Sequence, residues 1–155
     1  MTTTLRKDFL QKQLPELLNK LEAESPANFG VMTAQHMVEH LTWIIKSSIK
    51  NYGEAPAEPT KGQLKFKQFI ANGAVFKHFP KEDAEVGKLK YASLEEALTQ
   101  IPIAISRFYD FFEANPDHIP FNPMMGSLSF EELELFHYQH CRYHLWQFDL
   151  IKEYS

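Results

Sequence analysis

The sequence contains a single cysteine, Cys141, so no disulfide can form within the chain. A chain of 155 residues can bury a sizeable core without such a covalent link. One unpaired cysteine also agrees with a reducing compartment. We therefore expect a single domain over residues 1–155, located in the cytoplasm.

Long apolar runs and an excess of positive charge are also missing. The longest apolar stretches, such as residues 101–105, are far shorter than the roughly 20 residues that span a bilayer. The first residues lack the apolar core of a signal peptide. The chain has 16 basic and 20 acidic residues, a formal net charge of -4. We therefore expect neither a membrane segment nor a nucleic-acid partner.

Helical periodicity is present along most of the chain, and no segment has the pattern of a hairpin. We expect four long helices: residues 4–24, kinked or split at Pro15; residues 33–50, capped by Thr33; residues 93–114, bent at Pro102; and a last helix from Ser129 nearly to the end of the chain. A shorter helix over 63–72 lies between loops at 51–62 and 73–92. The predicted fold is all-α, a four-helix bundle with a long crossover between the second and third long helices.

Histidines are unusually concentrated in the last predicted helix. At about 100° per residue, His137, His140 and His144 fall within an arc of about 60°, on the face that points into the bundle. Several buried imidazoles are hard to satisfy with hydrogen bonds alone, whereas a divalent metal accepts a lone pair from each. The spacing of His140 and His144 places two ring nitrogens one turn apart, as in many zinc and nickel sites.

A third ligand must come from another element, and the second helix offers His36 and His40. His40 lies at the edge of the apolar stripe and His36 is rotated further towards solvent, so geometry favours His40. The alternative is that His40, His140 and His144 are core histidines with ordinary hydrogen-bond partners, and for His40 alone this alternative is about as strong as metal binding. Three histidine ligands would leave one or two coordination positions for water or substrate, as in catalytic metal sites.

The other candidate groups are assigned lesser roles. We expect His137 to line the pocket rather than bind the ion, His36 to lie at the surface or pocket rim, and His78 and His118 to be solvated. Cys141 is either a small buried thiol, which we favour, or a thiolate ligand. For a general base, Glu39 points about 100° away from His40. The other available groups are Tyr109, Asp110, Tyr138 and Tyr143.

Two segments together resemble the DinB/YfiT-like superfamily of metalloenzymes. These are MTAQHMVEHL at 32–41 and FNPMMGSLSFEELELFHYQHCRYHLWQF at 121–148. More narrowly, the chain is similar to a branch with a G-x-M segment before the first histidine helix, a P-x-x-G-x-L-S turn and an H-x-x-x-H-L-x-Q-F ending. It departs from the family pattern at Tyr143, where a histidine is frequent, and at Phe29, where tryptophan is usual.

This resemblance implies a four-helix bundle with a long crossover and a divalent ion, zinc or nickel, on the triad His40, His140 and His144. It also implies a homodimer and, as in characterised relatives, a low-molecular-weight thiol as co-substrate. The leading hypothesis is a metal-dependent transferase or hydrolase that activates water or a thiol for attack on a small-molecule substrate. The alternatives are a non-catalytic metal- or ligand-binding bundle, serving as an interaction module, and, far behind, haem binding between facing histidines.

Overall fold

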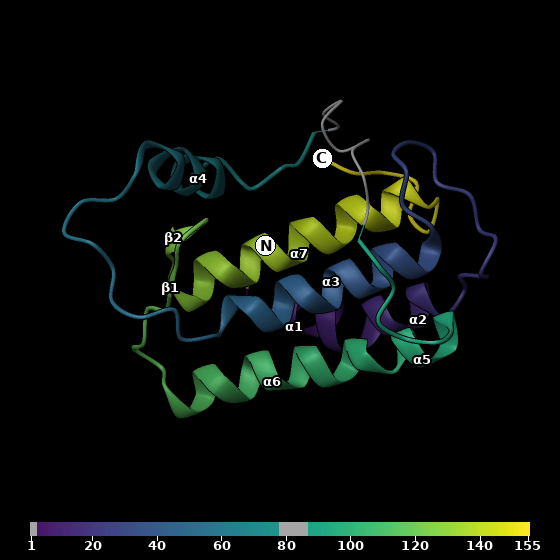
Figure 1. Ribbon diagram of the computed structural model, residues 1–155, viewed down its shortest axis with the longest axis horizontal. Coiled ribbons are helices and arrows are strands. Elements are labelled where there is room, and N and C mark those ends of the chain that lie inside the picture. The colour runs from purple at the N-terminus through teal and green to yellow at the C-terminus, as the bar shows by residue number, and fades with distance from the viewer. Residues whose placement is uncertain (1–2, 78–86) are drawn as a thin grey trace.

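The computed structural model describes residues 3–77 and 87–155 of the chain, and this part is mostly helical (Figure 1). The first helical region comprises α1 (Thr3–Asp8), a π-helical stretch η1 (Phe9–Gln13) and α2 (Leu14–Leu18). The other helices are α3 (Ala34–Ser48), α4 (Lys61–Ala71), α5 (Leu94–Leu98), α6 (Gln100–Ala114) and α7 (Phe130–Gln147). This helical content agrees with the predicted all-α class.

Side-chain caps begin the helices at the predicted positions. Thr33 Oγ1 accepts a hydrogen bond from the His36 amide at 3.1 Å, and Ser129 Oγ accepts one from the Glu132 amide at 3.3 Å. Each bond satisfies a backbone donor that has no partner within the helix. These caps fix where α3 and α7, the two helices that carry the clustered histidines, begin.

Prolines interrupt two of the predicted helices. Just before Pro15 the backbone widens into η1, where the Leu14 amide donates to the Phe9 carbonyl, and the region ends at Leu18 rather than at residue 24. The predicted helix over 93–114 is divided into α5 and α6 at Thr99 instead of being bent at Pro102. A proline ring crowds the carbonyl four residues earlier, and for Pro102 that carbonyl is the last one of α5.

A small antiparallel hairpin, β1 (Phe121–Asn122) and β2 (Gly126–Ser127), was not predicted. Strands of two residues are too short to show an alternating pattern. The residue types that favour turns were the available sequence signal. Asn122 Oδ1 accepts from the amides of Met124 and Met125 at 2.8 and 3.1 Å, and Gly126 has a φ of 87°.

The last helix ends at Gln147, so the prediction that it runs nearly to the end of the chain was wrong. Asp149 adopts a left-handed φ of 59°, and the Leu150 amide donates to the Leu145 carbonyl at 2.8 Å. This pattern closes helix ends. The chain then turns back, and the ring of Tyr154 stacks on Trp146 of α7.

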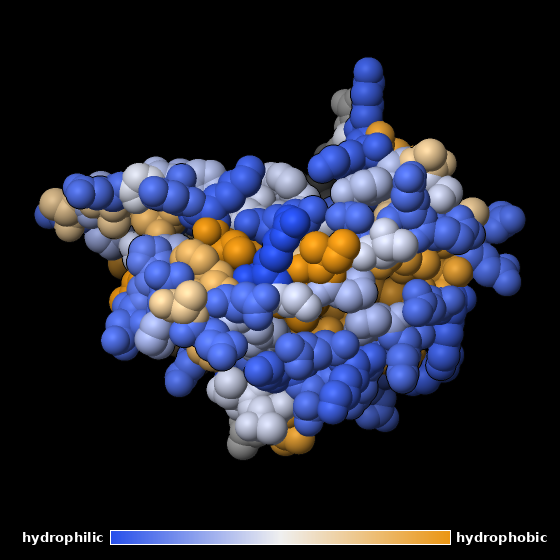
Figure 2. Space-filling view, turned by 90° about the horizontal axis from the view of Figure 1, so that it is seen from below, coloured by the Kyte–Doolittle hydropathy of each residue, from blue (hydrophilic) through white to orange (hydrophobic). Residues whose placement is uncertain are grey.

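Helix α3 contacts α5, α6 and α7, while the first helical region contacts α6 and α7. The buried apolar side chains between these helices include Leu10, Leu14, Leu41, Ile45, Ile101, Phe108 and Leu145. The face seen from the α6 side is largely hydrophilic, with apolar side chains in separate patches (Figure 2). In the part of the chain that the structure describes, no helix is both long and apolar enough to cross a membrane.

The linker between α3 and α6 contains α4 and α5. Helix α4 begins at Lys61, slightly before its predicted start, and packs on β2 and α7 (Figure 1). His78, together with residues 78–86 of the loop predicted over 73–92, lies outside the described residues.

Candidate metal centre

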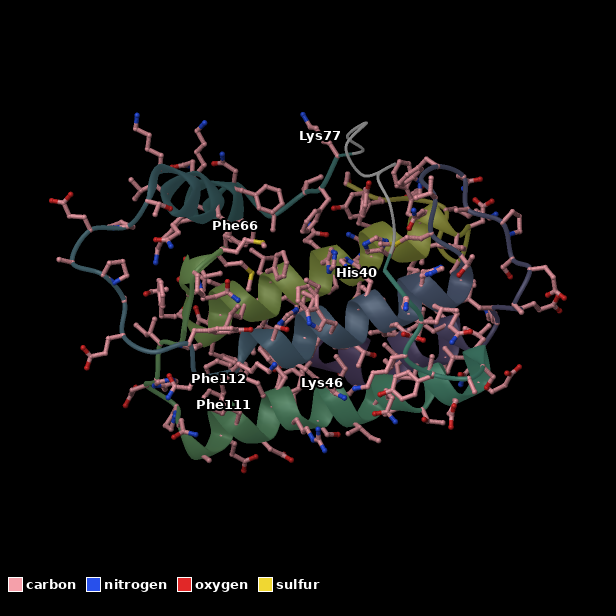
Figure 3. The ribbon with its side chains drawn as sticks, viewed as in Figure 1. His40, Lys46, Phe66, Lys77, Phe111 and Phe112 are labelled. Carbon is pink, nitrogen blue, oxygen red and sulfur yellow. The ribbon has the colours of Figure 1, made fainter. Side chains whose placement is uncertain are left out.

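Three histidines from two helices converge between α3 and α7. They are His40 of α3, which lies near the centre of the molecule (Figure 3), and His140 and His144 of α7. The Nε2 atom of His140 is 3.1 Å from that of His40 and 3.2 Å from that of His144. The three ligand atoms all lie within 4.8 Å of one another, close enough to bind one metal ion.

The two nitrogen separations that involve His140 fit a first-row divalent ion. With a Zn–N distance of about 2.05 Å, two nitrogens 3.1 or 3.2 Å apart subtend about 100° at the ion. This angle lies between the octahedral and tetrahedral values. The histidine rings form a nearly regular triangle, with centroids 4.9, 5.1 and 4.7 Å apart.

Gln147, one turn beyond His144, fixes which nitrogen of His144 is free. The Gln147 amide nitrogen donates to the Phe29 carbonyl at 2.9 Å, so its oxygen faces His144 Nδ1, 2.7 Å away. Because this oxygen can only accept, Nδ1 of His144 must carry the proton. The Nε2 atom of the neutral ring is then a bare lone pair directed at the centre of the triad, as metal binding requires.

Hydrogen bonds among the three histidines cannot satisfy all three Nε2 atoms at once. Since His144 Nε2 carries no proton, its contact with His140 needs a proton on His140 Nε2. That one proton can be directed at His144 or at His40, but not at both. A cation that accepts the lone pairs of all three nitrogens removes this conflict, so the donor set fits a divalent metal.

Burial keeps the triad neutral. It lowers the pKa of His40 to about 4 and, together with the proximity of His40, lowers the pKa of His144 to about 3. The pKa of His140 is also held well below its usual range, first by burial and then by the neighbouring histidines. Neutral imidazole is the form that binds metal, so near neutral pH protons compete little for these nitrogens.

Aromatic rings surround the triad. Phe136 stacks on His140 at 5.3 Å between centroids, and Phe76 lies 5.1 Å from the same ring. Tyr143 packs against His144 at 5.1 Å. His140 and His144 are therefore buried, while His40 is partly exposed and is the member of the triad nearest to solvent.

The remaining histidines do not join the triad in the described part of the chain. His36 Nε2 is 3.1 Å from the Gly87 carbonyl oxygen, and His118 is exposed beside Phe111. His137 is buried in the core, with its Nε2 2.9 Å from Ser48 Oγ. Burial lowers the pKa of His137 to about 3.

Cys141 is a free, buried thiol outside the group of three histidines. Burial raises the pKa of its thiol. A buried cysteine with a raised pKa is held as a neutral thiol, and a neutral thiol is a poor metal ligand. This agrees with the small buried thiol favoured from the sequence.

The candidate general bases are mostly engaged elsewhere. Both carboxylate oxygens of Glu39 accept backbone amides, from Lys90 at 2.6 Å and Tyr91 at 3.2 Å. Burial alone would raise the pKa of Glu39, but these bonds and that from the Gln35 side chain outweigh it and lower the pKa. Glu39 therefore anchors the segment at 90–91 to α3.

The three tyrosine candidates and Asp110 lie in four different places. Tyr109 donates to the buried Glu134 at 2.7 Å, and Tyr138 packs against Phe9 at 5.1 Å between ring centroids. Asp110 is exposed. Of the four, Tyr143 is the one whose ring contacts a triad histidine.

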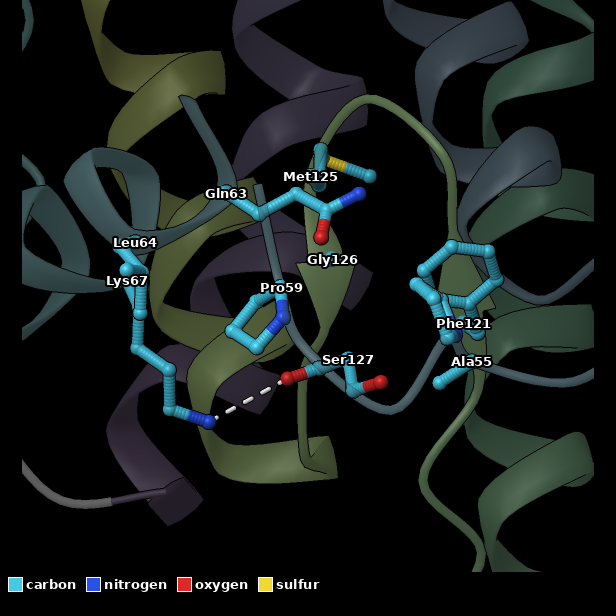
Figure 4. A pocket seen from close by; sticks show the side chains of 10 residues that line it. Ala55, Pro59, Gln63, Leu64, Lys67, Phe121, Met125, Gly126 and Ser127 are labelled. Carbon is cyan, nitrogen blue, oxygen red and sulfur yellow. Dashed lines mark hydrogen bonds between the residues drawn. The ribbon is translucent and has the colours of Figure 1, made fainter. Parts of the chain in front are cut away.

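A shallow pocket of about 220 Å³ lies away from the triad, between α4 and the hairpin (Figure 4). Its lining includes Gln63, Leu64, Phe121 and Met125, and Lys67 bridges it with a 3.3 Å bond to the Ser127 carbonyl. No triad histidine contributes to this pocket, so the pocket gives the metal centre no substrate cavity.

Comparison of the chain with known proteins found no relative. No family model matches the chain, and no curated protein or solved structure matches it either.

Replacing Gln147 with leucine is expected to weaken metal binding about 10- to 100-fold, the usual cost of losing a hydrogen bond that orients a ligand. The bond to His144 Nδ1 would be lost, and the ring could turn or change tautomer. Competition with a chromophoric chelator measures the affinity. Gln63→Leu is the matched control, because Gln63 is also buried and donates to a backbone carbonyl, that of Pro123 at 2.8 Å, away from the triad. Equal affinities in the two variants would contradict the role assigned to Gln147.

Proposed function

We propose that this chain is a DinB-like, metal-dependent enzyme built as a four-helix bundle. Zinc or nickel would be held by His40, His140 and His144, and the protein would act on a small molecule as a thiol-dependent transferase or a hydrolase. The observation that carries the proposal is the convergence of three Nε2 atoms from helices far apart in the sequence.

The local surroundings of the triad support this proposal. The motif H-L-x-Q-F supplies both a ligand, His144, and the glutamine that orients it. The two positions that depart from the family pattern, Phe29 and Tyr143, contact each other with ring centroids 5.5 Å apart. The two departures thus adjoin each other, and neither removes a triad nitrogen.

A divalent ion on this triad would supply Lewis acidity and lower the pKa of a bound water or thiol. The chain's own contribution is to keep three imidazoles neutral and converging, and to line them with apolar rings that exclude bulk water. The group of three histidines contains no carboxylate, so these three ligands leave the charge of a dication uncompensated. Such a centre favours an anionic further ligand, for example a thiolate or hydroxide.

Binding of an exogenous anion tests for the open coordination position that catalysis requires. In the cobalt-substituted protein, azide is expected to shift the visible absorption bands in a saturable manner. A thiol donor is expected to produce its own shift and to compete with azide. Cobalt bands that respond to neither ligand would indicate a closed coordination sphere and would favour the non-catalytic metal-binding bundle. If the open site is found, screening of electrophilic substrates with thiol donors follows.

A further inference from the structure

Phe76 forms one wall of the triad although it belongs to no helix. It follows α4 in the linker, and its ring centroid lies 5.1 Å from His140 and 5.7 Å from Tyr143. Its other neighbours are Phe69 at 4.9 Å and Phe136 at 5.6 Å. The ring thus covers one side of His140, the histidine whose Nε2 is close to both of the others.

The backbone of Phe76 is held by a side chain from the end of the described chain. The Phe76 amide donates to the phenol oxygen of Tyr154 at 2.6 Å, across a separation of 78 residues. A segment outside helices and strands has no regular ladder of backbone hydrogen bonds, so single contacts of this kind decide where it lies. Three residues earlier, the Gly73 carbonyl accepts a bond from Gln139 of α7 at 3.0 Å.

Tyr154 is in turn fixed to α7, the helix that carries two of the triad histidines. Its ring stacks on Trp146 with 5.7 Å between centroids and meets Tyr143 edge-on at 5.7 Å. The Arg142 guanidinium lies 5.5 Å from the centre of the ring. These contacts place the phenol oxygen in a fixed position relative to His140 and His144.

We propose that Tyr154 is a positioning residue that holds Phe76 against the triad and thereby excludes bulky ligands from the His140 side of the metal centre. This inference rests on the proposed metal site. A hydrogen bond fixes the backbone of Phe76, whereas ring packing alone would let the wall move outwards. Tyr154 therefore limits the size of the ligands that the metal centre accepts, although its own side chain does not reach that centre.

The test compares two ligands of the same donor type and different size, imidazole and 4-phenylimidazole, on the cobalt-substituted protein. In Tyr154→Phe, the affinity for 4-phenylimidazole relative to imidazole is expected to rise roughly two- to tenfold, the effect of one hydrogen bond. Phe76→Ala is expected to raise the same ratio further. Tyr138→Phe is the control, because it removes a phenol oxygen from a buried tyrosine of α7 whose ring packs on Phe9.

Each outcome decides the question. A raised ratio in Phe76→Ala with no change in Tyr154→Phe would show that packing alone holds the wall, and would overturn the role of Tyr154. No change in either variant would overturn the wall itself. A wild-type protein that binds no metal would refute the proposed function instead. In that case hydrogen exchange still tests the hydrogen bond, because the Phe76 amide should exchange faster in Tyr154→Phe than in Tyr138→Phe without any metal.

Discussion

Alanine in place of His140 is expected to abolish tight binding of a divalent ion. The Nε2 atom of His140 lies 3.1 and 3.2 Å from the other two ligand atoms, so its loss leaves two histidines on different helices. Metal analysis of the purified protein, followed by titration of the metal-free form, measures the effect. His40→Ala and His144→Ala are expected to behave alike, whereas His118→Ala, at an exposed loop position, should retain the ion. Full metal content in all three triad variants would refute the site.

The same substitution also removes metal-linked stability. An ion at a hundredfold excess over its Kd stabilises the folded state by about 2.7 kcal/mol, which for a chain of this size is a rise of roughly 5–11 °C in Tm. Chelation should therefore lower the Tm of the wild type by about that amount and leave the Tm of His140→Ala unchanged. Thermal unfolding followed by circular dichroism separates this loss of metal binding from a general loss of folding.

The second large effect is expected for Glu134→Ala, away from the metal centre. Glu134 is completely buried, accepts from Arg6 Nε at 3.0 Å and accepts from the Tyr109 hydroxyl at 2.7 Å. Removing one partner of a buried ion pair costs about 3–5 kcal/mol. Because 12% of the Arg6 side chain is exposed, we expect a loss near the lower end of this range. This is a large share of the roughly 5–15 kcal/mol that stabilises a typical domain. Denaturation in urea measures the change.

Two further variants show whether the pairing itself matters. Glu113→Ala, at an exposed position of α6, should change the stability by no more than about 0.5 kcal/mol. The triple variant Arg6→Met, Glu134→Leu and Tyr109→Phe also removes the hydroxyl that donates to Glu134, and it should recover most of the loss, since apolar replacement of a buried pair is often nearly neutral. If Glu134→Ala were no worse than Glu113→Ala, the network would contribute nothing to stability.

The features that depend on residues only a few positions apart were the ones predicted from the sequence. Thr33 and Ser129 begin their helices because the capping bond spans only three residues, and His140 and His144 share a face because helical spacing is fixed. The choice of His40 over His36 followed from the same geometry. In the structure, His36 instead meets Gly87 and His40 meets the α7 histidines.

What could not be predicted depends on contacts between distant segments. Glu134 falls about 60° from His137, at the edge of the inward face, but its charge argues for exposure unless Arg6, 128 positions earlier, is known to lie beside it. Gln147 had a detectable signal, its position one turn after His144, but its orientation depends on the carbonyl of Phe29. Tyr154 had no such signal, because its role arises only after the chain reverses direction at Asp149.

The separation of 100 residues between His40 and His140 has a consequence for when the ion can bind. During synthesis, α3 leaves the ribosome long before α7, and His40 has no partner until α7 has formed and docked. An ion bridging the two helices closes this long loop as a reversible cross-link. The ion binds tightly only after folding has brought the two helices together, because closing the loop costs conformational entropy. Metallation would therefore be a late event, and bound metal would distinguish fully folded molecules from incomplete ones.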